Sequence, residues 1–427
     1  MESQVKHPAI STEDPSYRKR TPVLPVVGAK TMTLGAPASL SWDGAAPRPF
    51  QIAVEDSVLD DLKRRLRAAR WPDQIPGEPW RYGTNLEYLK ALCAYWHDSY
   101  DWRKNEAELN RFKQYKVVIG GTEIHFIHEP GEGLNPRPLL LSHGWPGSFY
   151  EYHKLIPRLT RPSAHGGDPA DAFTVVVPSL PGYGFSFTPG QRRFGINEIS
   201  TICAALMADV LGYPRFSAHG HDWGAFIASR LGYAHPELLQ AIHITLLATP
   251  RERSASQPRT ADEERFYRQL DHWLKEETGY FKIMGTKPQT LAYALTDSPV
   301  GLAAWILEKF RTWSDCSGDI DQHFGRDVLL TNIMLYWVTG AIGSTFWPYY
   351  ARLHGDRIVP EDGHVSVPTG YAEHPREILT PPRSLVERTY PNIRRWSRMP
   401  VGGHFPALEA PDALADDIRA FFRSVER

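Results

Sequence analysis

The pentapeptide Gly220-His221-Asp222-Trp223-Gly224 constrains the fold of this chain more than any other feature of its sequence. Its spacing is that of a nucleophile elbow, a sharp turn from a strand into a helix that presents the central side chain. The central residue is normally a serine, and here it is Asp222. The simpler interpretation is that Asp222 caps the helix that begins near Trp223.

A carboxylate at the centre of the elbow changes the chemistry that the turn can support. Attack by Asp222 on a carbonyl carbon would give a labile anhydride, which is unsuited to ordinary ester or peptide hydrolysis. Attack on an sp³ carbon instead leaves an alkyl-enzyme ester that water can later cleave. The elbow therefore predicts a substrate with an electrophilic carbon and a leaving group, such as an epoxide or an alkyl halide.

Composition excludes several other classes of protein. The chain has 427 residues, 42% of them hydrophobic, and a formal net charge of -1, which predicts neither a nucleic-acid partner nor an anionic membrane surface. Its three cysteines, Cys93, Cys203 and Cys316, form no disulfide framework or metal-ligand spacing. Residues 1–47 lack both a signal peptide and an apolar run long enough to cross a membrane. A soluble, cytoplasmic protein without a membrane anchor is expected.

Changes in composition and periodicity divide the chain into segments. The first of them is rich in proline and small residues and is expected to form a flexible arm, which hints at contact with a neighbouring copy in a homodimer. A helical, aromatic block without convincing strands interrupts a later β-α-β pattern, as an inserted lid would. The predicted segments are the arm at 1–47, a helical module at 48–115, the first half of an α/β core at 116–250, the lid at 251–350 and the second half of the core at 351–427.

Individual elements are predicted from the spacing of apolar residues. Helices are expected from 56 to the Trp71-Pro72 step, at 85–96, at 196–210 and at 412–425. Strands are expected in a hairpin of 115–119 with 123–127, and at 139–141, 173–177, 216–218, 241–247, 365–367 and 393–399. The alternation indicates a mostly parallel sheet with helices on both faces, the pattern of the α/β-hydrolase fold.

Candidate partners of Asp222 follow it in the chain order typical of this fold: nucleophile, acid, histidine. His404 lies in a glycine-flanked loop between the last predicted strand and the last helix, and is the expected base. Glu377 is the expected acid, which would fix the tautomer of His404 and stabilise its imidazolium form. Glu373 and Glu409 remain alternatives, because a carboxylate in a proline-containing loop is usually only solvated.

A second glycine-rich loop, from His143 to Gly147 with the sequence HGWPG, follows the predicted strand at 139–141. The backbone N–H groups of Trp145 and Trp223 are expected to point at the ester oxygen as an oxyanion hole. His143 is interpreted as part of this loop. Taken alone, the segment would be a simple turn of glycine and proline, and the elbow further along the chain makes the oxyanion loop the better interpretation.

Together these motifs resemble those of the epoxide hydrolases, in the microsomal-type branch that includes the insect juvenile-hormone epoxide hydrolases. The resemblance extends from about residue 49 to the C-terminus, and residues 48–115 resemble the family's N-terminal helical domain. Two departures are expected: this chain is not expected to carry the membrane anchor of the mammalian members, and His374-Pro375 stands in place of an aromatic-proline step. The matching blocks are HGWPGSF at 143–149, PGYGFS at 181–186, GHDWG at 220–224, the lid stretch 286–310 and GGHF at 402–405.

The resemblance implies two lid tyrosines that hydrogen-bond the epoxide oxygen. Tyr280 matches the first, and Tyr349 matches the second, with the adjacent Tyr350 as an alternative. The resemblance also supports Glu377 as the acid. It implies hydrolysis of a small, hydrophobic epoxide to a vicinal diol through an ester on Asp222, with no metal or organic cofactor. Detoxification, hormone turnover and biosynthesis remain open as biological roles.

Two other functions remain open. A haloalkane dehalogenase would share the aspartate and the histidine, and the indoles of Trp145 and Trp223 could then hold the departing halide. A catalytically silent homologue would bind a hydrophobic epoxide or terpenoid without converting it. The lid tyrosines favour the epoxide hydrolase over both alternatives.

Overall fold

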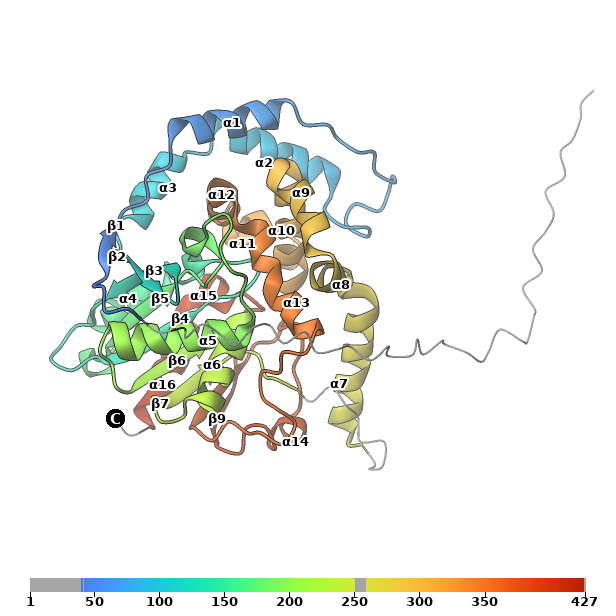
Figure 1. Ribbon diagram of the computed structural model, residues 1–427. Helices are drawn as coiled ribbons and strands as arrows, with labels where there is room; N and C mark the ends of the chain where they lie inside the picture. Colours follow the sequence, from blue (N-terminus) through green and yellow to red (C-terminus); the bar gives the residue numbers. More distant parts are fainter. Residues whose placement is uncertain (1–39, 41, 250–258, 426–427) are drawn as a thin grey trace, which may run out of the picture. The chain divides into compact units, whose positions relative to one another are not determined.

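A nine-stranded sheet lies at the centre of the fold in the computed structural model, which describes residues 40, 42–249 and 259–425 (Figure 1). The strand order is β1-β2-β3-β5-β4-β6-β7-β8-β9. Pairing is parallel from β5 through β9 and antiparallel among β1, β2, β3 and β5, so the prediction of a mostly parallel sheet is confirmed. The strands are β1 (Arg48–Phe50), β2 (Gln114–Ile119), β3 (Thr122–Glu129), β4 (Arg137–Ser142), β5 (Phe173–Pro178), β6 (Phe216–Gly220), β7 (Leu239–Ile244), β8 (Thr369–Glu373) and β9 (Ile393–Arg398).

The central strands are apolar on both faces because helices cover both sides of the sheet. α5 (Ile196–Ala205) and α6 (Trp223–Ala234) pack together on one face, and α4 (Leu155–Thr160) packs with α16 (Pro411–Arg423) on the other (Figure 1). On α16, the buried Leu414, Ile418 and Phe421 lie at helical spacing. Gly370 in β8 leaves room for the Phe421 ring, because a Cβ there would lie 2.7 Å from it.

Parallel strands bring their carboxyl ends to one edge of the sheet, and this edge positions the candidate site. Ser142 at the end of β4 is in register with Gly220 at the end of β6. Glu373 at the end of β8 is in register with Arg398 at the end of β9. The four loops that carry the predicted site residues therefore leave the sheet at the same edge, with β7 between the strands of the second and third.

Helices without strands occupy residues 259–350, in the segment predicted to be a lid. In Figure 1 they group beside the sheet, next to the N-terminal helices. Ser298 begins the longest of them by accepting a hydrogen bond from the N–H of Gly301, and Pro299 follows at the first helical position. The elements are α7 (Ala261–His272), the π-helix η7 (Trp273–Glu277), α8 (Gly279–Thr286), α9 (Pro288–Asp297), α10 (Pro299–Trp313), α11 (Ile320–Phe324), α12 (Arg326–Thr339), the 3₁₀ helix η8 (Ala341–Phe346) and α13 (Trp347–Leu353).

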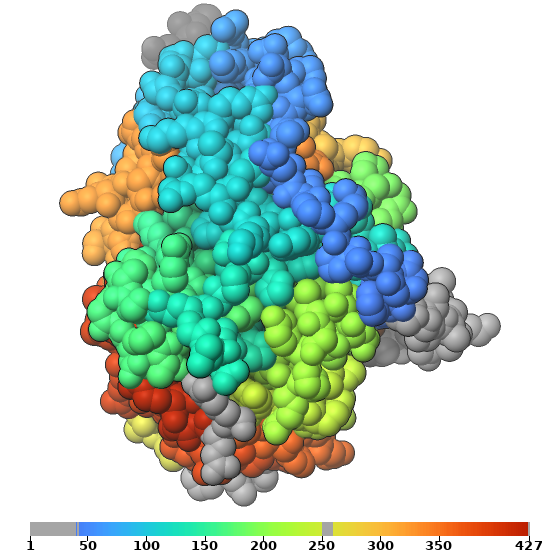
Figure 2. All heavy atoms as spheres, turned by 90° about the vertical axis from the view of Figure 1, so that its left-hand side faces the viewer, coloured from blue at the N-terminus to red at the C-terminus, as the bar shows by residue number. Residues whose placement is uncertain are grey.

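Three helices precede β2: α1 (Asp56–Arg67), α2 (Leu86–Asp98) and α3 (Trp102–Leu109). The first two were predicted, and α3 was not, because its short sequence buries only Trp102, Glu106 and Leu109. Hydrogen bonds tie this module to the lid, including Tyr88 to Asp321 at 2.6 Å. Figure 2 shows the module, in blue and cyan, beside the orange atoms of the lid.

One predicted strand is wrong. Residues 365–367 are not in the sheet, and the strand begins at Thr369 instead. Val365 and Val367 are buried because both pack against Gly232 of α6, where a Cβ would lie 2.9 Å from each. Pairing with β7 begins only at Pro368, whose carbonyl accepts the N–H of Ile242. The alternating buried valines thus have the apolar pattern of a strand but not the hydrogen bonds of one.

Some predictions fall on parts of the chain that the structure does not describe. Residues 1–39 and 41 carry most of the predicted arm and the segment searched for a signal peptide, and residues 250–258 carry the start of the predicted lid. Trp42, within the predicted arm, forms a bridge with Ile119 of β2. Among the described residues, no individual helix combines the length and apolar character of a membrane span; α12 followed by η8 and α13 meets that test only as a pair bent by 100°.

Candidate active site

Asp222 lies at the turn between β6 and α6 in a conformation that few side chains adopt. Its φ is 49° and its ψ is -128°, which is strained for a residue other than glycine. Gly220 and Gly224 make the sharp turn feasible, because a Cβ at Gly220 would lie 2.2 Å from Gly224 and one at Gly224 would lie 1.7 Å from the Ser142 carbonyl oxygen. The Asp222 side chain forms no capping bond to α6, so the simpler interpretation as a helix cap is wrong.

The Asp222 carboxylate instead lies between two loops. Its Oδ1 accepts the backbone N–H of Trp145 at 2.7 Å, and its Oδ2 lies 3.2 Å from Nε2 of His404. A Cβ at Gly144 would lie 2.1 Å from Oδ1, so only glycine leaves room for the carboxylate at that position. Each carboxylate oxygen therefore has its own partner.

His404 joins Asp222 to Glu377. Its Nδ1 lies 2.6 Å from Oε1 of Glu377, and the ring is fully buried. The backbone N–H of His404 donates to the Trp313 carbonyl at 2.9 Å, and the Trp313 ring contacts the imidazole edge to face at 5.0 Å. Burial alone would lower the pKa of His404, but the carboxylates of Glu377 and Asp222 hold that pKa well above its usual range.

The loop that carries Glu377 is held beside the loop that carries His404. Arg376 forms a parallel bridge with Gly403, and its N–H donates to the Gly402 carbonyl. His374 stands where an aromatic residue was expected: it is buried, its Nδ1 donates to the Val401 carbonyl at 3.0 Å, and burial lowers its pKa. The departure from the aromatic-proline step therefore keeps this loop packed.

The two alternative acids serve other contacts. Glu373 accepts the indole N–H of Trp396 at 2.9 Å. Glu409 accepts the backbone N–H groups of Gly403 at 3.0 Å and Phe405 at 2.9 Å, which shapes the loop around His404. Of the three candidates, only Glu377 is hydrogen-bonded to the imidazole.

Hydrogen bonds to the core and to the lid hold the loop from His143 to Gly147 in place. His143 accepts the N–H of Leu180 at Nε2 and donates from Nδ1 to the Gly144 carbonyl, and burial lowers its pKa to about 3, so it stays neutral. On the lid side, Asn332 donates to the Pro146 carbonyl at 2.8 Å and Tyr336 to the Gly147 carbonyl at 2.6 Å. These bonds position the Trp145 N–H that points at Asp222.

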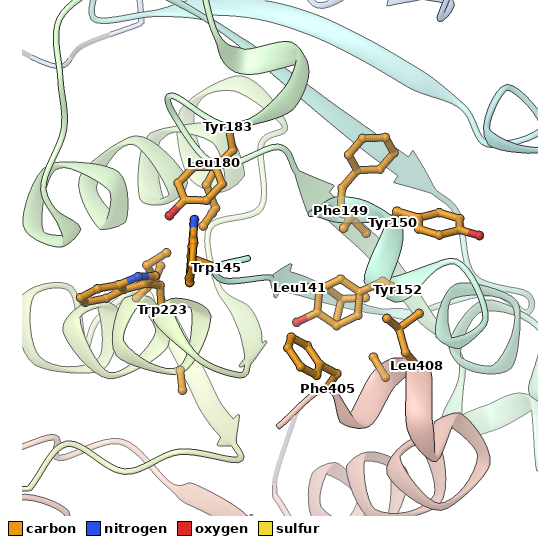
Figure 3. Packing of buried hydrophobic residues seen from close by; sticks show 14 of the residues in the cluster. Leu141, Trp145, Phe149, Tyr150, Tyr152, Leu180, Tyr183, Trp223, Phe405 and Leu408 are labelled. Carbon is orange, nitrogen blue, oxygen red and sulfur yellow. The ribbon is translucent and has the colours of Figure 1, made fainter. Parts of the chain in front are cut away.

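Trp223 directly follows Asp222 in the chain and is the first residue of α6. N–H groups in the first turn of a helix have no partner within the helix, so its backbone can offer a second donor. Figure 3 shows the indoles of Trp145 and Trp223 in the same part of the core as Tyr183. The oxyanion role of both N–H groups stays a prediction.

Tyr280 of α8 and Tyr349 of α13 are both buried at the site. Their rings are 5.7 Å apart, and Trp145 contacts both, stacked parallel to Tyr280 at 5.4 Å and edge to face with Tyr349 at 5.8 Å. Burial, followed by the Asp222 charge, raises the pKa of Tyr280 well above its usual value, and burial with Tyr280 and Asp222 does the same for Tyr349. Both phenols therefore stay protonated and can donate.

Tyr350, the alternative to Tyr349, lies elsewhere. It is only half-buried, its ring stacks on His354 at 3.9 Å, and it contacts Trp347. Of the two neighbours, the structure brings only Tyr349 into the aromatic cluster with Tyr280 and Trp223, whose ring lies 4.8 Å away.

Sequence reasoning missed a second buried histidine and carboxylate behind the elbow. Nε2 of His221 lies 2.6 Å from Oε2 of Glu151, and both side chains are 1% exposed. Glu151 fills the space beside Gly147, where a Cβ would lie 1.5 Å from its Oε1. In the sequence, the one signal for this pair was the acidic Glu151 shortly after the HGWPG loop.

Trp313 was also missed, although it lies just beyond the matching lid stretch. It ends α10 and contacts the rings of both His404 and Tyr280, the latter at 5.3 Å. Phe281 adds a further aromatic contact to Tyr349 at 5.1 Å. The site is therefore walled largely by aromatic side chains, and the carboxylates, the imidazole, the phenols and backbone N–H groups are among its polar groups.

A strained aspartate at a strand-to-helix elbow, with a buried histidine and glutamate in the expected chain order, defines a hydrolase of the α/β-hydrolase fold whose elbow carries a carboxylate. Family models agree: one described as "Epoxide hydrolase N terminus" matches residues 47–152, and one described as "alpha/beta hydrolase fold" matches residues 137–282. The predicted fold class is confirmed.

Relatives identify the family. The chain is 39% identical to "Epoxide hydrolase 1" of Oryctolagus cuniculus, over 89% of each chain. It is 36% identical to "Juvenile hormone epoxide hydrolase 2" of Ctenocephalides felis, over 87% of this chain and 84% of the relative. The solved structure of Aspergillus niger epoxide hydrolase superposes with a TM-score of 0.79 at 30% identity, covering 92% of this chain and 100% of the other. The chain therefore belongs to the epoxide hydrolase family, which confirms the main functional prediction over its two alternatives.

Proposed function

We propose that this epoxide hydrolase opens hydrophobic epoxides by attack of Asp222 and releases vicinal diols after hydrolysis of the resulting ester. One observation carries the assignment of residues: the Asp222 carboxylate lies between the Trp145 N–H and the imidazole of His404, and the Trp145 ring contacts a cluster that holds two protonated tyrosines. This arrangement offers a nucleophile, a base and acids around one small space.

In the first step, Tyr280 and Tyr349 hold the epoxide oxygen. Oδ1 of Asp222 stays hydrogen-bonded to the Trp145 N–H, which later stabilises its negative charge, so Oδ2 on the His404 side is the oxygen that attacks the ring carbon. A carbon–oxygen bond forms at Oδ2 while the ring carbon–oxygen bond breaks. The electron pair of the broken bond goes to the former ring oxygen, which takes a proton from a tyrosine.

In the second step, His404 removes a proton from water, and the hydroxide attacks Cγ of the esterified Asp222. The Trp145 and Trp223 N–H groups stabilise the negative charge on Oδ1. The bond between Cγ and Oδ2 then breaks, and Oδ2 takes a proton from the His404 imidazolium, so the diol leaves with Oδ2. Asp222 keeps an oxygen from water, and the proton of its new carboxyl group returns to the tyrosine that lost its proton in the first step. Glu377, 2.6 Å from His404, stabilises the imidazolium that forms between these events.

The substrate class follows from the walls of the site. Trp145, Trp313 and Phe281 surround the two tyrosines with apolar ring surface. Apolar walls with a few converging polar groups favour a ligand that is apolar except at its reacting centre. Aryl and terpenoid epoxides fit this description better than polar ones.

The finer expectations about the protein's surroundings are also proposals. The net charge of -1 supports a protein without a nucleic-acid partner. Three cysteines, all buried and without disulfides, support a reducing, cytoplasmic location. A homodimer is proposed only from the composition of the arm at 1–47. The five segment boundaries are likewise proposals, made from changes in composition and periodicity along the sequence.

The experiment that tests the proposed function follows oxygen atoms. Wild-type enzyme in excess over a styrene-type or terpenoid epoxide, in water enriched in the heavy oxygen isotope, should form a diol that carries no label from that first turnover. The label should instead appear in the peptide that contains Asp222, as measured by mass spectrometry. Label in the first diol would mean direct attack by water and would contradict the ester. Halide release from bromoalkanes without diol formation would favour a dehalogenase.

Removal of either tyrosine hydroxyl is expected to slow ester formation. Tyr280→Phe and Tyr349→Phe should each slow it by about 10²-fold, which is typical for the loss of one donor to a developing oxyanion. Tyr350→Phe is the matched control and should leave the rate unchanged, because its ring stacks on His354 outside the site. Rapid-mixing fluorescence of the site tryptophans measures the rate. An effect of Tyr350→Phe equal to that of Tyr349→Phe would contradict the assignment.

A further inference from the structure

A buried lysine lies against the ring of Tyr280. Lys309 of α10 is 6% exposed, and its Nζ lies 4.6 Å from the centre of the Tyr280 ring and 5.6 Å from that of Trp313. Its ammonium also forms an ion pair with the neighbouring Glu308. Lys309 precedes Trp313 by one helical turn, so one face of α10 contacts both the phenol of the lid and, through Trp313, the imidazole of His404.

Negative charges dominate the other surroundings of Tyr280. After burial, the carboxylates of Asp222, Glu308 and Glu277 raise its pKa, which makes the phenol a weak acid. Lys309 counteracts these negative charges, as its effect on the neighbouring Glu277 indicates. Burial and the Glu308 carboxylate raise the pKa of Glu277, whereas the Lys309 ammonium lowers that pKa. The lysine is thus the positive member of a cluster of Glu277, Glu308 and Lys309 around the phenol.

Stability alone does not account for a charge in this place. Taking an ammonium and a carboxylate out of water costs free energy that their attraction offsets only in part, and an apolar side chain of similar volume is often as stabilising. Lys309 fills its space with a four-carbon stem that methionine could replace. What methionine could not supply is the positive charge over the ring.

We infer that Lys309 is a positioning residue for ester formation that acts through Tyr280, by stabilising the negative charge that develops on the phenol oxygen as it gives its proton to the opening epoxide. The inference rests on the proposed function. The ammonium lies 4.6 Å from the centre of the ring and both side chains are buried, so the attraction is weakly screened. The charge is useful only while the phenol is losing its proton, and so it contributes to the transition state rather than to substrate binding.

The inference predicts a selective loss of ester formation. Lys309→Met should slow this step on the order of tenfold, the effect of a desolvated cation over an aromatic ring. Decay of the ester in the same single-turnover experiment should keep its wild-type rate, since Tyr280 is not the base of that step. Lys309→Arg, which keeps the charge, should restore most of the rate. If the methionine variant does not fold, Lys309→Gln replaces it.

A double-mutant cycle distinguishes this role from a structural one. In the background Tyr280→Phe, which keeps the ring and removes the hydroxyl, Lys309→Met should cause no further loss. Lys282→Met is the matched control, because Lys282 lies on the same helix as Tyr280 but is exposed. An unchanged rate in Lys309→Met, an equal slowing of both steps, or an additive loss in the double variant would overturn the inference. Absence of any ester in the wild-type enzyme would overturn the proposed function itself.

Discussion

Replacing Asp222 with alanine is expected to lower turnover of an epoxide by about 10⁴-fold or more, the effect of removing a nucleophile on which both chemical steps depend. Among the described residues, the candidate site holds no ready substitute for this nucleophile. Burial raises the pKa of Tyr280 and of Tyr349, so neither phenol ionises to attack carbon. Glu377 is held by His404 and lies behind it.

Asp222→Ser sharpens this test. Serine is the usual residue at such an elbow, and it could retain the turn and the neighbouring N–H donors. Attack by a serine oxygen on an epoxide carbon would give an ether, which has no carbonyl carbon for water to attack. The serine variant should therefore form no diol catalytically, even if it becomes alkylated once.

Diol formation measured over many turnovers separates these outcomes, with circular dichroism to verify the fold. Alanine has to adopt the positive φ of position 222, so a modest loss of thermal stability is expected in that variant. Turnover within tenfold of the wild-type rate in Asp222→Ala, with the fold intact, would remove Asp222 from the nucleophile role.

The elbow and the central strands were predictable because their signals are local. Gly220 and Gly224 are required by backbone approaches within a few residues of Asp222 or across to the adjacent strand. Uninterrupted apolar runs such as Leu139-Leu140-Leu141 are typical of strands buried on both faces. Chain order then assigned His404, and the family resemblance favoured Glu377 over Glu373 and Glu409; the structure places His404 and Glu377 within hydrogen-bonding distance of the expected neighbours.

Other features depend on contacts between distant segments, and the sequence carried little sign of them. Successive residues on a helix point about 100° apart, so only the packing of α13 decides that Tyr349 and not Tyr350 joins the site. Lys309 would be assigned to a solvated face on its residue type alone, and Glu151 meets His221 only through the fold. Val365 and Val367 were mistaken for a strand because burial and pairing leave the same apolar pattern.

Replacing His404 with glutamine is expected to stop the reaction at the ester. The first step requires Asp222 and the tyrosines, so the carboxylate should still be alkylated. The second step lacks its base, whose removal typically costs 10²–10⁴-fold, about the range expected here. Intact-protein mass spectrometry should show a gain equal to one whole epoxide, located on the peptide that contains Asp222. Steady-state diol formation should fall in parallel.

The pKa of His404 gives a second measure of the same step. In the free enzyme, Glu377 and Asp222 raise this pKa, so the imidazole is held in its protonated form. Esterification removes the charge of Asp222, and the pKa of His404 should then fall, which frees the imidazole to act as a base. Decay of the wild-type ester should therefore speed up as the pH rises through that lowered pKa. The slow decay in His404→Gln should lack this dependence.

Two further variants test whether accumulation of the ester is specific to loss of the His404 base. Glu377→Gln keeps the imidazole but removes the charge that stabilises its protonated form, so ester should accumulate to a smaller extent than in His404→Gln. His354→Gln is the control, since this histidine is exposed and stacks on Tyr350 outside the site. If folded His404→Gln gave no adduct with an epoxide that the wild-type enzyme converts, then the first step would need His404 as well, and the two steps would not divide between these residues as proposed.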